Sequence, residues 1–291
     1  MSSFQGIWVP LVTPFHNGAI DFVGLRRLVS HLLEKGVDGL VVCGTTGEPA
    51  AMSKQEQLAV LDAVLELVPA DRIVMGLAGN NLSELLQFQR EILKRPVAGL
   101  LVPPPYYIRP SQAGLEAFFQ TVADASSVPL ILYDIPYRTG VAFEQATLLN
   151  IVAHERIVAI KDCGGNFSNT LALLNSGQVD VLCGEDNQIF SALCLGAKGA
   201  IAASAHVHPE RFVQLYQQIR DNQLAAGRVT FFQLLPLIQS LFIEPNPAPV
   251  KTALALEGLI ADELRAPMQR SSEAMVTRLK EVLGTLAHDN R

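Results

Sequence analysis

Two short apolar runs of the chain carry, near their ends, residue types that can do carbonyl chemistry. Lys161 stands next to last in RIVAIKD (156–162), and Tyr133 stands next to last in VPLILYD (128–134). A neutral lysine amine attacks ketones and aldehydes to form a Schiff base, and a tyrosine hydroxyl can transfer protons during that reaction. The two residue types therefore indicate imine chemistry, provided that the fold brings them together.

Alternation along the two runs predicts that they do meet. Ile131 and Tyr133 share one face of the first run, and Ile157, Ala159 and Lys161 share one face of the second. If both faces point into the same interior, the amine and the phenol lie at the same height in a partly dry pocket. Burial there disfavours the ammonium form and favours the neutral, nucleophilic amine.

Polar or glycine-rich segments follow the run of Tyr133 and an earlier apolar run. CGTTGE (43–48) brings Thr45, which we expect to relay protons to Tyr133, and YDIPYRTG (133–140) brings Arg138. Each segment taken alone has an ordinary interpretation. A lysine at a strand end is usually a solvated charge, and GTTG is usually a turn in which glycine supplies the φ freedom. The conjunction of these residues at successive strand ends favours an active site.

The elements that must position these residues are eight short runs, most of them rich in Val and Ile. The runs are 6–13, 37–43, 72–78, 97–103, 128–134, 156–162, 179–185 and 198–204. Near-continuous apolar character suits parallel strands that are covered on both faces, and amphipathic segments such as 25–36 and 54–68 predict helices between them. Eight such units in about 200–250 residues predict an α/β fold, a (β/α)8 TIM barrel.

The ends of the predicted elements add three expectations. Ser53 is expected to cap the helix over 54–68, with Gln57 in its first turn. The chain after about residue 208 has no further strand-like run, so we divide it into a barrel over 1–222 and a small C-terminal helical region over 223–291. A doubly wound sheet with a phosphate-binding turn is disfavoured, because neither G-x-G-x-x-G nor G-x-x-x-x-G-K-[ST] occurs.

Composition excludes several classes of protein. The 291 residues are 49% hydrophobic and 17% charged with a net charge of -6, which argues against a nucleic-acid partner or an anionic membrane surface. No apolar run reaches the roughly 18–20 residues of a membrane span, and the N-terminus lacks the pattern of a signal peptide. The four cysteines show no zinc spacing and predict reduced thiols in a cytoplasmic protein. Neither Glu185 with Asp186 nor His206 with His208 has metal-ligand spacing, so we expect no metal.

As a set, the motifs of this chain resemble those of the pyruvate-dependent Schiff-base lyases and synthases of the N-acetylneuraminate lyase superfamily. The nearest resemblance is to its dihydrodipicolinate synthase family. The motifs, in chain order, are GTTGE (44–48), PPPYY (103–107), Y-x-x-P-x-R-T-G (133–140), IK-x-x-x-G (160–165) and EPNPAPVK (244–251). The resemblance implies a (β/α)8 barrel with a helical C-terminal part, assembled as a homotetramer of two tight dimers. It also implies pyruvate and a small aldehyde as substrates, with no metal or organic cofactor.

The resemblance also implies a role for individual residues. Lys161 would form the imine with pyruvate, and Arg138 would bind the carboxylate of the second substrate, aspartate semialdehyde; a guanidinium suits a carboxylate. A proton relay would run through Tyr133, Thr45 and a Tyr107 that reaches across the dimer interface. The pyruvate end would be formed by Thr46, Gly184 and Ile201. A feedback site for lysine would use Asn80, Glu84 and Tyr106, although Lys54 and Gln57 stand where histidines often occur in the family.

Departures from the family pattern keep two alternatives open. Asp134 and Tyr137 stand where the synthases have asparagine and serine, and DCGG (162–165) replaces E-A-T-G. The first alternative is that the chain is an aldolase, which cleaves a 2-keto-3-deoxy sugar acid or a related 2-keto acid and releases pyruvate. The other alternative is a non-catalytic paralogue that binds a keto acid. The presence of Lys161, Tyr133 and Thr45 together argues against the second alternative, since a simple binding protein needs no imine-forming amine.

Overall fold

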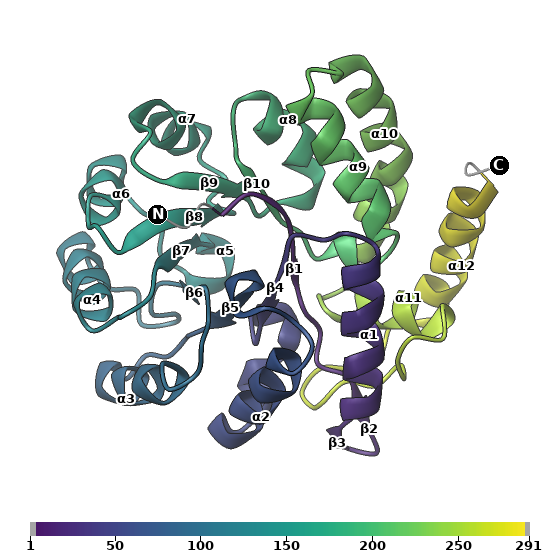
Figure 1. The fold of residues 1–291 in the computed structure, drawn as a ribbon, viewed down its shortest axis with the longest axis horizontal. Coiled ribbons are helices and arrows are strands. Elements are labelled where there is room, and N and C mark those ends of the chain that lie inside the picture. The colour runs from purple at the N-terminus through teal and green to yellow at the C-terminus, as the bar shows by residue number, and fades with distance from the viewer. Residues whose placement is uncertain (1–3, 289–291) are drawn as a thin grey trace.

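A computed structural model describes residues 4–288 of the chain as a closed eight-stranded parallel barrel (Figure 1). The strands are β1 (Gly6–Pro10), β4 (Gly39–Val42), β5 (Ile73–Gly76), β6 (Gly99–Val102), β7 (Leu130–Asp134), β8 (Ile157–Asp162), β9 (Asp180–Cys183) and β10 (Gly199–Ile201). Each strand pairs with the next, and β10 pairs with β1 to close the sheet. The predicted (β/α)8 barrel is confirmed, and each strand lies within one of the eight predicted runs.

Helices surround the barrel and cover its outer face (Figure 1). They are α1 (Phe22–Glu34), α2 (Lys54–Leu65), α3 (Leu82–Ile92), α4 (Gln112–Asp124), α6 (Gln145–Val152), α7 (Phe167–Ser176), α8 (Ile189–Cys194) and α9 (Pro209–Arg220). A further short helix, α5 (Pro136–Thr139), lies in the loop after β7. Ser53 caps α2, as predicted. Ser53 and Glu56 form a reciprocal capping box, and the Gln57 amide donates to the carbonyls of Pro49 and Met52.

Three further helices follow the barrel: α10 (Leu224–Leu241), α11 (Ala248–Leu256) and α12 (Glu273–His288). Helix α10 is long and apolar enough to cross a membrane by length and composition alone, and 44% of it is buried in the fold. It packs against α9 and α12, and Leu224, Val229 and Phe232 are exposed on its other face. Figure 1 shows it beside α9. The division of the chain at residue 222 stays a prediction.

A small antiparallel hairpin was missed by the sequence prediction. Strands β2 (Phe15–His16) and β3 (Ala19–Ile20) pair across Asn17 and Gly18, both of which have positive φ. Asn-Gly is a common sequence for such a two-residue turn, because both positions tolerate that backbone conformation. The turn signal was therefore present in the sequence, but strands of two residues leave no periodicity.

Two apolar layers hold the barrel together. The interior is filled by inward-facing side chains of the strands, among them Trp8, Val41, Val74, Leu101, Ile131, Ala159, Leu182 and Ile201. The second, larger layer lies between the strands and the surrounding helices. Ile157 belongs to this outer layer, so its predicted inward direction was wrong. A register shift between β7 and β8 pairs Leu130 with Ile157 and Ile131 with Ala159, and the extra residue, Val158, reverses the alternation there.

Candidate active site

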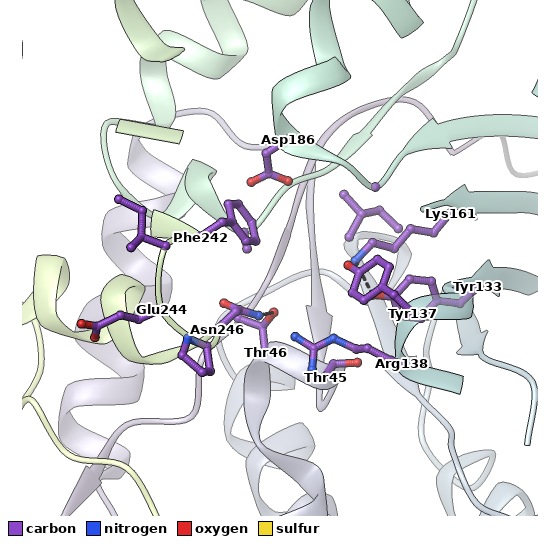
Figure 2. Close-up of a pocket in the computed structure, with 15 residues that line it drawn as sticks. Thr45, Thr46, Tyr133, Tyr137, Arg138, Lys161, Asp186, Phe242, Glu244 and Asn246 are labelled. Carbon is purple, nitrogen blue, oxygen red and sulfur yellow. Dashed lines mark hydrogen bonds between the residues drawn. The ribbon is translucent and has the colours of Figure 1, made fainter. Parts of the chain in front are cut away.

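A cavity of about 310 Å³ opens at the carboxyl ends of the barrel strands (Figure 2). Of the eight residues predicted for the catalytic and substrate-binding site, seven line it: Thr45, Thr46, Tyr133, Arg138, Lys161, Gly184 and Ile201. They come from the ends of β4, β7, β8, β9 and β10 or from the loops that follow these strands. Parallel strands bring all their carboxyl ends to one rim, which is why residues far apart in sequence converge here.

Lys161 and Tyr133 meet inside the barrel. They are directly paired across β8 and β7, and the Lys161 Nζ donates to the Tyr133 hydroxyl at 3.3 Å. Both side chains are buried, at 6% and 5% exposure. The predicted encounter of an amine and a phenol in one buried site is therefore present.

Gly184 has no side chain, and the Lys161 side chain occupies the space that a Cβ atom would need. A Cβ atom at position 184 would lie 2.3 Å from the Cys163 Sγ and 2.9 Å from the Lys161 Cγ. Any side chain there would push the lysine away from Tyr133. Glycine at this strand end is thus required by close packing.

The hydroxyl of Tyr133 is held in its protonated form. Burial raises the pKa of Tyr133 well above its usual value, and the neighbouring Cys163 acts in the same direction, whereas Arg138 opposes it. Thr45, which lines the same cavity, lowers the pKa of Tyr133 and so also opposes the shift. A phenol that keeps its proton at neutral pH suits a group that donates and recovers a proton during carbonyl addition.

The turn that follows β4 presents Thr45 and Thr46 to the cavity. Its backbone closes through a bond from the Gly47 N–H to the Gly44 carbonyl at 2.8 Å, and the Thr13 hydroxyl donates to the Gly47 carbonyl at 2.7 Å. Thr46 is buried, and its hydroxyl oxygen accepts a hydrogen bond from the Asn246 Nδ2 at 2.9 Å. The turn thus brings two threonines to the cavity: the Thr46 hydroxyl is held by Asn246, and Thr45 is exposed.

Arg138, Tyr137 and Asp186 are charged and polar groups on the cavity wall. Arg138 and Tyr137 lie on α5, and both are largely exposed. Asp186 is buried and accepts a hydrogen bond from the Ser204 N–H at 2.6 Å, and burial raises its pKa to about 6. The cavity therefore offers a cation suited to a carboxylate and, separately, an acid that titrates near neutral pH.

Sequence reasoning missed one whole side of the cavity. Five lining residues lie between α10 and α11: Phe242, Ile243, Glu244, Pro245 and Asn246 (Figure 2). The motif EPNPAPVK was recognised, but its place in the fold was not predicted, because these residues are about 200 positions away from the threonines they face. The closely spaced prolines of this motif, which lie outside any helical pattern, were the one feature of the sequence that indicated a loop of fixed conformation.

Tyr107 does not line this cavity. It lies in the loop between β6 and α4 with a φ of 72° and 89% of its surface exposed. Its neighbour Tyr106 borders a second cavity of about 420 Å³, which shares Thr45, Tyr133 and Arg138 with the first. The Tyr106 N–H donates to the Asn80 Oδ1 at 2.9 Å, so two residues of the predicted feedback site are in contact.

The third residue of the predicted feedback site, Glu84, lies in the first turn of α3. Burial lowers the pKa of the Lys54 amine, and the Glu84 carboxylate opposes this shift by favouring the charged form of that amine. Lys54 and Gln57 both border the second cavity. The Lys54 Nζ lies 4.2 Å from the centre of the Phe88 ring. A cation therefore already stands at the wall of this cavity.

Asp134 and Asp162 form a carboxyl pair at the ends of β7 and β8, one residue beyond Tyr133 and Lys161. They are paired in register, and Asp162 accepts hydrogen bonds from the Gly164 N–H at 2.9 Å and the Thr170 hydroxyl at 2.5 Å. Asp134 is buried, and its Oδ1 has no hydrogen-bond partner among the described residues. Burial, and to a lesser degree Asp162, raises the pKa of Asp134 to about 7.

Asp134 should make the protein less stable as the pH rises. An unfolded aspartate has a pKa of about 3.9, so between that pH and about 7 the folded chain holds a proton that the unfolded chain lacks. Stability falls with rising pH across this window and stays low above it. Asp134→Asn cannot ionise, and we expect it to be more stable than the native chain at pH 8 by up to about 4 kcal/mol.

Urea unfolding at pH 8 and pH 5 measures this difference, which should shrink at the lower pH. Asp71→Asn, which removes the same charge from an exposed site, is the matched control and should change the free energy of unfolding by less than about 0.5 kcal/mol at both pH values. Equal stability of Asp134→Asn and the native chain at pH 8 would show that the carboxyl is not strained there.

The described residues contain no group of three or more His, Cys, Asp or Glu side chains placed to hold a metal ion. The donors near the cavity, a lysine, two tyrosines, two threonines and an arginine, are instead the groups of acid–base and imine chemistry. A barrel whose carboxyl rim gathers these groups around a buried lysine is a (β/α)8-barrel enzyme.

Comparison with known proteins gives the family. The sequence profile of the dihydrodipicolinate synthetase family matches residues 3–286, and the chain belongs to this family. A 4-hydroxy-tetrahydrodipicolinate synthase of Trichlorobacter lovleyi is 37% identical over 96% of this chain and 98% of that protein.

Two solved structures show the same architecture. The 4-hydroxy-tetrahydrodipicolinate synthase of the methanotroph Methylacidiphilum fumariolicum superposes with a TM-score of 0.94 at 35% identity, over 98% of this chain and 97% of that one. A dihydrodipicolinate synthase of Acinetobacter baumannii, solved in complex with pyruvate, has a TM-score of 0.93 at 29% identity, with 98% of this chain and 99% of that one covered.

Proposed function

We propose that this protein condenses pyruvate with L-aspartate 4-semialdehyde to 4-hydroxy-tetrahydrodipicolinate, a step of lysine and diaminopimelate biosynthesis, through an imine on Lys161. The observation that carries the proposal is the buried Lys161–Tyr133 pair at 3.3 Å in a cavity that also holds Thr46 and Arg138. Membership of the dihydrodipicolinate synthetase family supports the substrates, as does the related Acinetobacter enzyme that was solved with pyruvate.

The reaction begins at the lysine amine. Lys161 Nζ attacks the keto carbon of pyruvate, water leaves, and the imine loses a proton from the methyl carbon to become an enamine. The enamine carbon attacks the aldehyde, and the amino group of the second substrate then displaces the lysine as the product ring closes. Tyr133 and Thr45, which line the same cavity, would move the protons of these steps.

The remaining residues would bind the substrates. Thr46 would hold the pyruvate carboxylate, and Gly184 and Ile201 would enclose the methyl end of the same molecule. Arg138 would bind the carboxylate of the aldehyde, with its planar guanidinium matching the two oxygens.

Tyr107 would complete the relay from a second copy of the chain. We propose a homotetramer built as a dimer of dimers, in the cytoplasm. The loop of Tyr107 supports this assembly, because it presents Tyr106, Tyr107 and Ile108 as exposed apolar groups on one segment. A second contact between copies of the chain would use other exposed apolar side chains. The candidates are Phe167 and Leu171 on α7 and Leu195 just after α8.

Asn80, Glu84 and Tyr106 would contribute to a regulatory site at the second cavity. Lys54 disfavours lysine as the regulatory ligand. Its ammonium group lies at the wall of the second cavity and would repel the positive charge of a lysine side chain. We therefore expect weak inhibition by lysine.

A pyruvate-releasing aldolase of 2-keto sugar acids is the second candidate. The observation in its favour is Tyr137, which lines the cavity beside Arg138 at a position where the synthases have serine. A non-catalytic keto-acid-binding paralogue is disfavoured by the joint presence of Lys161, Tyr133 and Thr45 in one cavity.

Turnover with a panel of aldehydes separates the candidates. With pyruvate as donor, we expect aspartate semialdehyde to give a product that the downstream reductase consumes. Arg138→Ala should raise the KM for the aldehyde by about tenfold or more and leave the KM for pyruvate nearly unchanged, because a charged hydrogen bond to only one substrate is lost. Cleavage of a sugar-derived keto acid without condensation of aspartate semialdehyde would establish the aldolase instead.

A further inference from the structure

The segment between α10 and α11 contributes to the cavity from outside the barrel. Residues 242–246 line the mouth opposite the strands, and Figure 2 shows Asn246 beside Thr46. Asn246 therefore belongs to the cavity wall by position.

The contact between these two residues has a defined direction. The Asn246 Nδ2 lies 2.9 Å from the Thr46 Oγ1, and an amide nitrogen can only donate. The threonine oxygen therefore accepts, and its own hydrogen stays available for another acceptor. Among the described residues the Thr46 hydroxyl donates to none. Thr46 thus keeps a hydrogen for a group that enters the cavity.

The turn that carries Thr46 and the segment that carries Asn246 are also held together by other contacts. Lys251, 0% exposed, forms an ion pair with Glu48, which lies two residues after Thr46 and is 3% exposed. The Lys251 Nζ also donates to the Glu263 carbonyl at 2.9 Å, and the Arg265 N–H donates to the Glu48 Oε2 at 3.2 Å.

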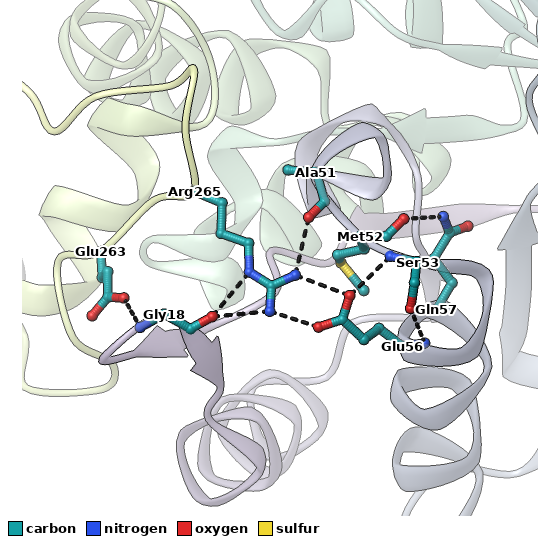
Figure 3. Close-up of polar contacts among 8 residues, drawn as sticks. All are labelled: Gly18, Ala51, Met52, Ser53, Glu56, Gln57, Glu263 and Arg265. Carbon is teal, nitrogen blue, oxygen red and sulfur yellow. Dashed lines mark hydrogen bonds and ion pairs between the residues drawn. The ribbon is translucent and has the colours of Figure 1, made fainter.

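The Arg265 guanidinium ties the same region to the β2–β3 hairpin and to α2 (Figure 3). It donates to the Gly18 carbonyl at 3.0 Å, to the Ala51 carbonyl at 3.0 Å and to both carboxylate oxygens of Glu56. These contacts fix the backbone on both sides of the cavity. Loss of the Asn246 amide should therefore change the direction of the Thr46 hydroxyl and leave the fold intact.

We propose that Asn246 is a positioning residue that directs the hydroxyl hydrogen of Thr46 toward the carboxylate of the keto-acid substrate. The inference rests on the proposed function, in which Thr46 binds that carboxylate. Asn246 acts on the substrate through Thr46, so its effect requires the threonine hydroxyl.

A double-mutant cycle tests this dependence. We expect Asn246→Ala to raise the pyruvate concentration that gives half-maximal borohydride trapping by about tenfold, the size of one charge-assisted hydrogen bond. Asn246→Asp should raise it further, because a carboxylate would accept the Thr46 hydrogen and repel the substrate. In a Thr46→Val background, Asn246→Ala should add less than about twofold. Asn150→Ala is the matched control, because the Asn150 amide donates to Glu116 on the outer surface, and it should have no effect.

Each outcome bears on one proposal. The positioning role would be overturned if Asn246→Ala left the pyruvate concentration for half-maximal trapping unchanged. It would also be overturned if the increases caused by Asn246→Ala and by Thr46→Val multiplied fully in the double variant. The KM for the aldehyde is the second readout, and it should stay unchanged in Asn246→Ala. If the native protein traps no pyruvate at all, the proposed function fails, and that result is distinguishable because it needs no variant of Asn246.

Discussion

Replacement of Lys161 by alanine is expected to abolish turnover, with kcat lower by at least about 10⁴-fold. The reason is chemical: the variant lacks the amine that forms the imine, and no other lysine lines the cavity within the described part of the chain. The measurement is the steady-state rate of condensation, coupled to the reductase that consumes the product.

Lys161→Arg is the control for charge. It keeps a cation in the cavity but offers no neutral nucleophile at ordinary pH, so it should be as inactive as Lys161→Ala. Circular dichroism and the melting temperature should show that both variants fold. Substantial residual turnover in either variant would mean that the reaction does not pass through a lysine imine.

Lys251→Met is expected to lower the free energy of unfolding by about 3–5 kcal/mol. Lys251 is fully buried and forms an ion pair with buried Glu48, and methionine would leave that carboxylate without its cation. Burial lowers the pKa of Lys251, while Glu48 opposes that shift by favouring the charged amine. Urea unfolding at neutral pH measures the loss.

The double variant Glu48→Gln with Lys251→Met separates the pair from the packing. Because it removes both charges, it should recover much of the stability that Lys251→Met alone loses. Lys280→Met, on α12 outside the cavity and this cluster, is the matched control and should have little effect. A Lys251→Met variant as stable as the native chain would show that Glu48 finds another partner or takes up a proton.

The eight strands were predictable because each is a short, nearly continuous apolar run. Parallel strands covered on both faces need that pattern, and helices with amphipathic sequences separate them. Strand alternation also predicted correctly that Lys161 and Tyr133 face the interior, because the register of β7 and β8 is regular from Ile131 onward. The direction of Ile157 was not predictable, since the irregularity that turns it outward depends on pairing between strands.

The far wall of the cavity could not be predicted for a different reason. The contact between Asn246 and Thr46 joins residues 200 positions apart. The ion pair between Lys251 and Glu48 joins residues 203 positions apart. Local propensity carries no information at that distance. Tyr107 illustrates the same limit, because its proposed partner lies on another copy of the chain.

The departures from the family pattern are resolved in part by the structure. Asp134 lies one residue beyond the cavity residue Tyr133 and faces Asp162, so its replacement of asparagine bears on stability and pH. Tyr137 lines the cavity and so bears on the choice of aldehyde. Cys163, in the DCGG segment, lies against Gly184 and beside Tyr133, so one departure also reaches the residues proposed to bind pyruvate.

The central claim is that Lys161 forms an imine with pyruvate, and borohydride trapping measures it most directly. Incubation of the native chain with pyruvate and borohydride, followed by peptide mass spectrometry, should add to Lys161 the mass of pyruvate less one oxygen. Lys161→Ala should show no such addition. Absence of the adduct on the native chain, or its appearance on a different lysine, would contradict the account.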